Sequence, residues 1–362
     1  MPRIAFCSLL AAALLAPDPC TALAGPERSV DQTRLMDTLR ALPPNRSAWG
    51  SDDNRRALAQ TETLLIEHLR DMGFTVAEPP FESPIPRKRW RTGAAATDGP
   101  EPADQPETLR TRNLSIDITG TELPLEVLLV GAHFDCVENC PGADDNGTGT
   151  AAALELARVL KDSLPRRTIR IAFFSMEEQG LVGAKHYLAG WNAANRASVE
   201  AGTPTERIIG MMSLEMLGFF SDEPESQKTP AGLDKLAPGI TLPTVGNFIA
   251  ITGLQKHQRF SAPLAAAMLK TAPELSVFRA DFFPFAIPDL YRSDHAPFMM
   301  ADIPAVMITD TSNYRNPHYH MPTDSIETID AVRFTRVVRA VAGAVSALAE
   351  AGVPAAEEPK ER

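Results

Sequence analysis

The sequence is 362 residues long, a length that suits one large domain or two domains of ordinary size. Hydrophobic residues make up 44% of it and charged residues 22%, the balance of a globular protein with a substantial core. The formal net charge of −11 argues against nucleic acid or an anionic membrane as a partner, because both carry negative charge themselves.

The first 24 residues have the pattern of a secretory signal peptide. Arg3 supplies a positive charge, residues 4–16 are almost entirely apolar, and residues 22–24 (Ala-Leu-Ala) have the small-x-small form of a cleavage site. The apolar run is too short to cross a bilayer as a helix. We therefore expect cleavage after Ala24, no integral membrane segment afterwards, and a periplasmic or secreted protein. The alternative is a retained amphipathic N-terminus.

Two of the four cysteines, Cys136 and Cys140, would remain after this cleavage. Because they are close in sequence and the expected compartment is oxidising, we expect a short disulfide between them. Zinc binding by the pair is the alternative, although two thiols cannot complete a four-cysteine structural site.

The predicted elements follow one another as helices and strands. Apolar spacing predicts helices at 29–42 and 53–72, and residues 75–77 resemble the start of a strand. Residues 79–107 are rich in proline, charge and small side chains, which indicates a surface excursion. The organised core begins at Asn113. There we predict strands at 114–118, 125–130, 168–174, 208–214, 248–251 and 305–308, and helices at 148–160, 181–191 and 331–351.

Strands that alternate with helices of about a dozen residues predict βαβ units and a mainly parallel sheet covered on both sides. The expected fold class is α/β, a three-layer sandwich with a central mixed, mainly parallel sheet flanked by helices. We expect one domain over residues 25–352 and a polar tail at 353–362. In such folds the active site lies where strands end and loops begin.

Six short segments carry acids or histidines at or near these strand ends. They are GAHFD (131–135), GADDNGTG (142–149), FSMEEQGL (174–181), SLEMLG (213–218), SDHAPF (293–298) and PHYHMPTD (317–324). Several have plain structural readings: a single histidine is often a surface or satisfied core residue, and paired acids suit a helix N-terminus. Glu215 is different because it ends an apolar strand, where a charge is costly without a partner.

Taken together, the segments offer His, Asp and Glu side chains, a common ligand set for catalytic zinc. Asp135 follows His133 by two residues in extended chain, so its carboxylate is expected to orient the imidazole ring for a metal. Adjacent Glu177 and Glu178 repel each other unless a cation or proton intervenes. Two roles are therefore natural, one acid binding metal while the other takes a proton from water. Two histidines and three carboxylates suit two metals that share one carboxylate.

In this order the segments resemble the co-catalytic di-zinc exopeptidases of metallopeptidase family 28, the bacterial leucyl aminopeptidase-like enzymes. The resemblance extends from about Arg46 to the C-terminal helix. It implies a zinc exopeptidase fold with two Zn²⁺ ions and five metal ligands. One ion would be held by His133, Asp145 and Glu215, and the other by Asp145, Glu178 and His320, with Asp145 as the bridge.

The resemblance also assigns catalytic roles: Glu177 would be the general base and acid, and the Asp135 carboxylate would bind the His133 ring and orient it for the metal. Tyr319 and Arg292 resemble residues that help to stabilise the tetrahedral intermediate; for Arg292 the alternative is a surface ion pair. Many family members have Asp where this chain has Glu215, which is one methylene longer and still an oxygen ligand. Asp144 is the poorer choice of bridge, because the family ligand directly precedes the Asn-Gly pair.

The function implied is that of a zinc-dependent aminopeptidase, which releases N-terminal residues from peptides with a free N-terminus through a metal-activated water. The alternatives are a single-zinc glutaminyl cyclase, a carboxypeptidase, and a non-catalytic scaffold or binding domain of the same fold. Glu177 and a complete ligand set argue against the scaffold. Loops 219–245 and 275–292 are expected to form the pocket for the N-terminal side chain, and the aromatic run 281–285 either lines it or packs in the core.

Overall fold

The computed structural model describes residues 25–85, 107–230, 239–283 and 288–353. The expected signal peptide at 1–24, most of the excursion at 79–107 and nearly all of the tail at 353–362 lie outside the described residues. Within the described ranges, no helix is both long enough and apolar enough to cross a bilayer.

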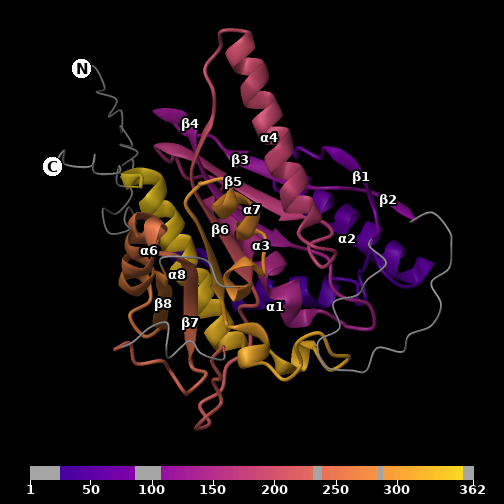
Figure 1. The fold of residues 1–362 in the computed structure, drawn as a ribbon, viewed down its shortest axis with the longest axis vertical. Helices are drawn as coiled ribbons and strands as arrows, with labels where there is room; N and C mark the ends of the chain where they lie inside the picture. Colours follow the sequence, from indigo (N-terminus) through magenta and orange to yellow (C-terminus); the bar gives the residue numbers. More distant parts are fainter. Residues whose placement is uncertain (1–24, 86–106, 231–238, 284–287, 354–362) are drawn as a thin grey trace, which may run out of the picture.

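A seven-stranded sheet forms the centre of the fold (Figure 1), with the strands in the order β3-β5-β4-β6-β9-β7-β8. β5, β4, β6 and β9 run parallel to one another, β3 is antiparallel to β5, and the parallel pair β7 and β8 is antiparallel to β9. The predicted mixed, mainly parallel sheet is therefore confirmed. The strand bounds are β3 Leu114–Ile118, β4 Leu123–His133, β5 Arg167–Phe174, β6 Arg207–Glu215, β7 Phe248–Leu254, β8 Ser276–Phe283 and β9 Ala305–Thr309.

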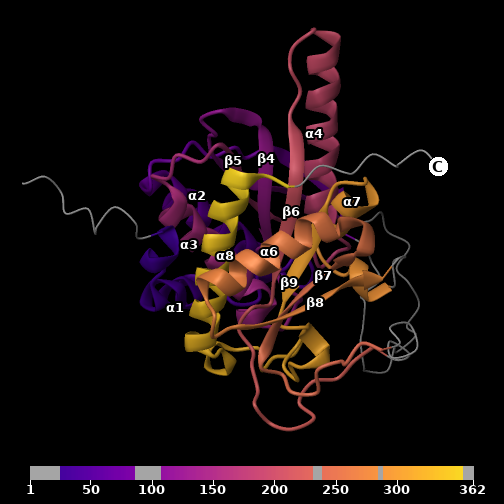
Figure 2. The ribbon, with the colours of Figure 1, turned by 90° about the vertical axis from the view of Figure 1, so that its left-hand side faces the viewer.

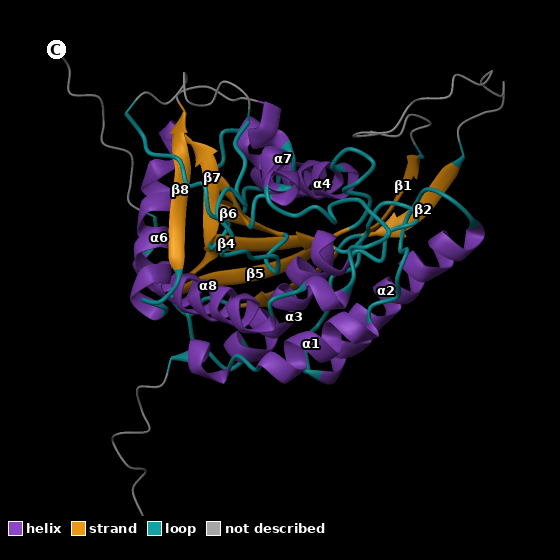
Figure 3. Cartoon of the chain, turned by 90° about the horizontal axis from the view of Figure 1, so that it is seen from below, coloured by secondary structure: helices purple, strands orange, loops and turns teal. Residues whose placement is uncertain are grey.

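Helices cover both faces of this sheet (Figure 3). One face carries α1 (Gln32–Ala41), α2 (Asp52–Asp71), α3 (Gly149–Leu160), α6 (Gln258–Thr271) and α8 (Ala331–Ala351), and the other carries α4 (Val182–Glu200) and α7 (His295–Met300). Successive side chains of each strand point to opposite faces of the sheet, so the strands contribute residues to two hydrophobic cores, one on each face. On β4, Leu128 and Val130 belong to the larger core and Leu129 to the smaller one beneath α4 and α7.

Several elements differ from the sequence prediction in length. The predicted helix at 181–191 continues to Glu200, and its outer end projects from the body of the molecule (Figure 2). β4 extends to His133, so this histidine is the last residue of the strand. The strand expected at 75–77 does not form; only Ala77 makes a bridge, to Ser115.

Other elements were missed because their local patterns are weak. α6 contains Pro263, a helix-breaking residue, and β8 is largely half-buried, which obscures the alternation. The excursion begins and ends in a small antiparallel ribbon of β1 (Pro80–Pro84) and β2 (Thr108–Arg112).

The order of connections determines where a site can form. The chain leaves β4 for β5 on one side and later returns to β6 on the other side of β4. The connections from the carboxyl ends of these strands diverge there, and in open α/β sheets ligands bind at such a point. The motif residues lie at this edge of the sheet.

Candidate metal centre and active site

The six predicted donor residues come from four strands and their loops. His133 and Glu215 are the last residues of β4 and β6, while Glu177 and Glu178 follow the end of β5. Asp145 lies in an irregular turn, η2 (Ala143–Thr148), that precedes α3, and His320 lies in the loop after β9. Because the carboxyl ends of parallel strands meet at one edge of the sheet, residues far apart in sequence converge there.

Two groups of metal-binding atoms result. In the first, the His133 Nε2 atom lies 3.3 Å from Glu215 Oε2 and 3.5 Å from Asp145 Oδ1. In the second, His320 Nε2 lies 3.1 Å from Asp145 Oδ2 and 3.2 Å from Glu178 Oε2. Asp145 thus directs one carboxylate oxygen to each histidine. The arrangement brings all five predicted ligands together.

Glu177 lies beside the first group. Its Oε2 atom is 4.0 Å from His133 Nε2, and its donor atom lies within 4.8 Å of those of His133 and Glu215. By distance alone Glu177 qualifies as a ligand as well as a base. Its neighbour Glu178 belongs to the second group, so the two adjacent acids face different donor groups.

Asp135 supports the site through both its main chain and its carboxylate. The His133 Nδ1 atom hydrogen-bonds to the backbone carbonyl of Asp135 at 3.1 Å, whereas its distance to the Asp135 carboxylate is 3.6 Å. The carboxylate accepts hydrogen bonds from the backbone N–H groups of Glu177 at 3.0 Å and Glu178 at 3.2 Å. Asp135 therefore holds the turn that carries both acids, and its main chain holds the imidazole.

Glu215 is supported by two serines. The Ser293 hydroxyl donates to Glu215 Oε2 at 2.7 Å, and Ser213 Oγ lies 2.9 Å from Ser293 Oγ. These contacts orient the longer side chain that stands where many relatives have Asp. The motif at 293–298 was a candidate for the site, but no role was predicted for Ser293.

Three residues at the ends of these elements have left-handed backbone conformations that non-glycine residues rarely adopt. Met176 (φ 58°) precedes the paired acids, Met216 (φ 52°) follows Glu215, and His320 has φ 58°. Such strain persists only where the surroundings impose it, and it clusters at functional sites.

The electrostatics of the cluster call for cations. Burial by itself lowers the pKa of His133, but the carboxylates of Glu215 and Glu177 raise it well above its usual value. Burial and neighbouring carboxylates also raise the pKa of Glu177 well above its usual value. Against the effect of burial, Glu178 and Asp145 raise the pKa of His320 to about 10.

The donor set fits zinc. Glu178 Oε1 is buried without a hydrogen-bond partner among the described residues, and an unpaired buried anionic oxygen is unfavourable unless a cation binds it. The two groups are built from imidazole nitrogens and carboxylate oxygens, the donors found in catalytic zinc sites. His133, Asp145 and Glu215 would hold one Zn²⁺, and Asp145, Glu178 and His320 the other.

Arg292 and Tyr319 lie next to this cluster. Arg292 donates from Nη2 to the Tyr319 hydroxyl at 3.1 Å, and the Tyr319 ring stacks on His320 with centroids 3.8 Å apart. Arg292 also contacts Asp289 at 3.4 Å and Asn313 at 2.7 Å. Burial and the acids Asp145 and Glu178 raise the pKa of Tyr319, so the phenol keeps its proton.

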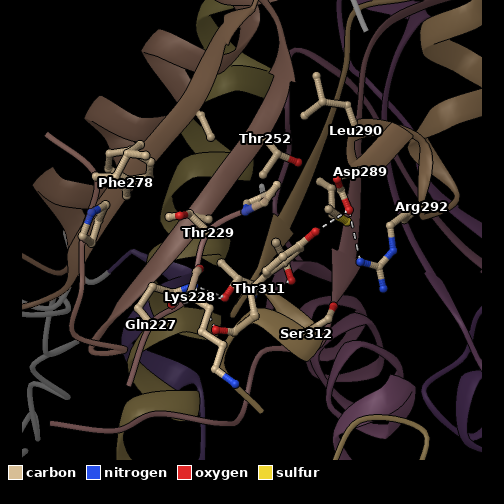
Figure 4. A pocket seen from close by; sticks show the side chains of 18 of the residues that line it. Gln227, Lys228, Thr229, Thr252, Phe278, Asp289, Leu290, Arg292, Thr311 and Ser312 are labelled. Carbon is tan, nitrogen blue, oxygen red and sulfur yellow. Dashed lines mark hydrogen bonds and ion pairs between the residues drawn. The ribbon is translucent and has the colours of Figure 1, made fainter. Parts of the chain in front are cut away.

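A largely apolar cavity of about 120 Å³ opens beside Glu215, Arg292 and Tyr319. Figure 4 shows Asp289 beside Arg292 at one side and Phe278 at the opposite side. Apolar lining residues include Leu242, Phe248, Ala250, Phe283 and Met307. About half of the lining comes from the two predicted ranges, 219–245 and 275–292, although much of the second range is strand β8 and not a loop. Phe283 of the aromatic run contributes to it, while residues 284 and 285 lie outside the described ranges.

The predicted disulfide does not form in this structure. Cys136 and Cys140 are buried free thiols. The physical reason is that each sulfur faces another acceptor: Cys136 Sγ lies 3.3 Å from the backbone oxygen of Cys140, and Cys140 Sγ lies 3.9 Å from Asp324 Oδ2. Burial raises the pKa of the Cys136 thiol to about 12, so neither a disulfide nor a thiolate zinc ligand is favoured there.

Other residues of the motifs have structural positions. Asp144 accepts hydrogen bonds from Gly218 N and Asn316 Nδ2 and belongs to neither donor group, in keeping with its rejection as the bridge. His295 is fully buried and bonds to the Leu290 carbonyl, away from both groups. Asp294 is buried with neither carboxyl oxygen hydrogen-bonded among the described residues, a feature that no sequence motif predicted.

Comparison with known proteins agrees with the geometry. The protein YfbL of Escherichia coli K12, described as uncharacterised, is 32% identical over 245 residues, which cover 66% of this chain and 70% of YfbL. A probable zinc metalloprotease of Leptosphaeria maculans is 30% identical over 69% of this chain, and aminopeptidase YwaD of Bacillus subtilis is 29% identical over 65%. The aligned parts span only 60% and 45% of those two proteins.

Solved structures share the fold. An aminopeptidase from Aneurinibacillus sp. strain AM-1 superposes with a TM-score of 0.62 at 17% identity, over 93% of this chain and 99% of that one. A glutaminyl cyclase from Fimbriiglobus ruber has a TM-score of 0.58 at 18% identity, over 88% and 95%. Peptidase family M28 matches residues 113–345. The chain therefore belongs to peptidase family M28 and is a metallo-exopeptidase, as the order of its motifs predicts.

Proposed function

We propose that the chain is an aminopeptidase that binds two Zn²⁺ ions and releases N-terminal residues with apolar side chains from peptides. The observation that carries the proposal is the position of Asp145, whose two carboxylate oxygens lie 3.5 Å from His133 and 3.1 Å from His320. A carboxylate between two such donor groups is suited to bridge two ions. When bound, the ions would lower the pKa of a water molecule and polarise the scissile carbonyl.

The proposed general base and acid is Glu177. Its carboxylate lies at the edge of the first donor group, and Asp135 fixes its backbone through the N–H bond at 3.0 Å. Burial and the neighbouring carboxylates raise the pKa of Glu177, which makes it a stronger base. It would accept a proton from the attacking water and return it to the amine that leaves.

Arg292 and Tyr319 are the proposed stabilisers of the tetrahedral intermediate. Both line the cavity, and their polar ends meet at 3.1 Å beside the donor group of His320. Hydrogen-bond donors held in place before the reaction stabilise the negative charge that develops on the carbonyl oxygen. The bond from Arg292 and the stacking on His320 hold the phenol in place.

The cavity supports a preference for apolar N-terminal residues. Its volume of about 120 Å³ is comparable to an apolar cavity of about 150 Å³ that holds a benzene-sized molecule. The negative charge of the carboxylates around the site would attract the positively charged α-amine of a peptide. The free N-terminus of a peptide would then lie near the carboxylates, and a first side chain of the size of leucine or phenylalanine would fill the cavity.

Glutaminyl cyclase activity is the principal alternative, since the fold is common to both activities. Zinc content separates them: two ions per chain favour the aminopeptidase, and one ion with cyclisation of N-terminal glutamine favours the cyclase. A carboxypeptidase would cleave N-terminally blocked peptides that have a free C-terminus. We also propose export from the cytoplasm, on the basis of the N-terminal 24 residues.

The test combines a panel of aminoacyl-p-nitroanilides with measured zinc content. We expect hydrolysis that is fastest for leucine or phenylalanine and abolished by exhaustive chelation. The variant Glu177→Gln should lower kcat by about 10² to 10⁴-fold. Its zinc content should stay unchanged if Glu177 acts as base and not as ligand. Full activity after complete removal of zinc would refute the proposal.

A further inference from the structure

Beyond these assignments, the structure points to Asp324 as a positioning residue for the bridging carboxylate. We infer that Asp324 holds the backbone that presents Asp145 and thereby determines the affinity of both metal positions together. Asp324 lies outside the donor groups among the described residues and is completely buried. The inference rests on the proposed metal set but not on the peptidase reaction.

Asp324 accepts hydrogen bonds from three consecutive backbone N–H groups in the turn before α3. Its Oδ1 atom accepts from Asp144 N at 3.0 Å, and its Oδ2 atom accepts from Asp145 N at 3.1 Å. Its backbone carbonyl accepts from Ala143 N at 3.2 Å. Both oxygens of the carboxylate are thus directed at the chain that carries the bridge, and none is directed at the donor groups.

The turn needs such support because it has no regular structure at the critical residue. Asp145 has φ −103° and ψ 96°, which lies outside the helical region, so helical hydrogen bonds cannot determine its orientation. The carboxylate of Asp145 must nevertheless face two histidines at once. Backbone N–H groups that donate to a carboxylate are held firmly, because charge-assisted hydrogen bonds are roughly twice as strong as neutral ones.

Asp324 also belongs to the segment that supplies the second histidine. His320 precedes it by four residues, and a backbone hydrogen bond from Asp324 N to Met321 O at 3.0 Å closes the turn between them. One short segment therefore provides a ligand to one metal position and orients the ligand shared by both. This juxtaposition connects chain positions 179 residues apart.

The experiment compares zinc binding by the original protein and by its Asp324→Asn variant, with zinc alone and no peptide present. Asparagine has the same shape but only one acceptor oxygen, so one of the two N–H groups would face an amide donor. Loss of a group that orients a ligand typically lowers metal affinity by about 10 to 100-fold. We expect the dissociation constants of both ions, measured by competition with a chromophoric chelator, to rise by this factor.

A matched control is Asp281→Asn, another buried acid, which accepts hydrogen bonds from Arg279 on β8. Its zinc affinity should remain within about threefold of the original. Urea unfolding of the metal-free proteins shows how far each substitution changes stability by itself. A second variant, Asp324→Glu, keeps both acceptor oxygens and should weaken zinc binding less than Asp324→Asn does.

Three results would overturn the inference. The first is zinc affinity in Asp324→Asn that equals that of the original chain. If Asp324→Asn does not fold, unchanged zinc affinity in Asp324→Glu takes its place, because it would show that the position of the acceptor oxygens does not matter. The second is an equal loss in Asp281→Asn, and the third is a loss confined to the ion held by His320. Since no peptide is used, a failure of aminopeptidase activity would leave the zinc result intact.

Discussion

Buried His295 makes the stability of the fold depend on pH in a definite direction. Its side chain is fully buried, its Nε2 atom bonds to the Leu290 carbonyl at 2.9 Å, and its Nδ1 atom has no partner among the described residues. Burial lowers the pKa of His295 from 6.5 to about 4. The folded protein therefore keeps this imidazole neutral across a range in which the unfolded chain binds a proton.

The direction of this pH dependence follows from the number of protons that the folded and unfolded states bind. Between pH 6.5 and pH 4 the unfolded state binds more protons at this position, so the free energy of unfolding falls as the pH falls. With these two pKa values, His295 lowers the stability by about 2 kcal/mol between pH 7.5 and pH 5. Above pH 7 the contribution is nearly constant, because His295 is neutral in both states.

The measurement is urea unfolding of the metal-free protein at pH 7.5 and pH 5, for the original chain and for His295→Gln. Glutamine keeps an N–H donor for Leu290 but does not titrate, so the contributions of all other groups cancel in the comparison. We expect the loss of stability on acidification to be smaller in His295→Gln by about 2 kcal/mol. Equal losses in the two proteins would refute the reasoning.

Three further substitutions probe the site. Tyr319→Phe removes the hydroxyl that meets Arg292 and should lower kcat by about 10²-fold with KM little changed; a change in KM alone would argue against the proposed role. Ser293→Ala removes the 2.7 Å hydrogen bond to Glu215 and should weaken zinc binding by about tenfold or more in chelator competition; unchanged affinity would contradict it. Thr252→Val removes a buried hydroxyl without a partner from the described cavity lining. It should raise the free energy of unfolding by up to about 1 kcal/mol and lower KM for leucyl substrates, and a higher KM would contradict the apolar assignment.

Much of the centre of the fold follows from local sequence patterns. Continuous apolar runs predicted β5, β6 and β9 to within a residue or two, because a strand buried on both faces carries its signal in every residue. The weaker patterns of β8 and α6 gave no such signal. Their places in the fold depend on partners elsewhere in the chain, β7 for β8 and α8 for α6.

The candidate site, too, was predictable from the sequence only in part. By itself the sequence determined which residues could serve as ligands and base, since acids and histidines next to buried strand ends are unusual and their order matches a family. It could not determine the partners of those residues. The actual contacts of Asp135, the free thiols of Cys136 and Cys140, and the role of Asp324 all depend on groups brought together by folding.

The physical reason is that secondary structure depends on residues close in sequence, whereas side-chain contacts depend on residues that are distant in sequence. Strand and helix periodicity is a property of neighbouring residues, and the end of a buried strand can be read from the sequence where the apolar run stops. The orientation of a carboxylate in an irregular turn is set instead by hydrogen bonds from distant segments, as in the contact between Asp145 and Asp324. The sequence alone therefore named five ligands, and only the tertiary structure decided that Asp145 faces both histidines.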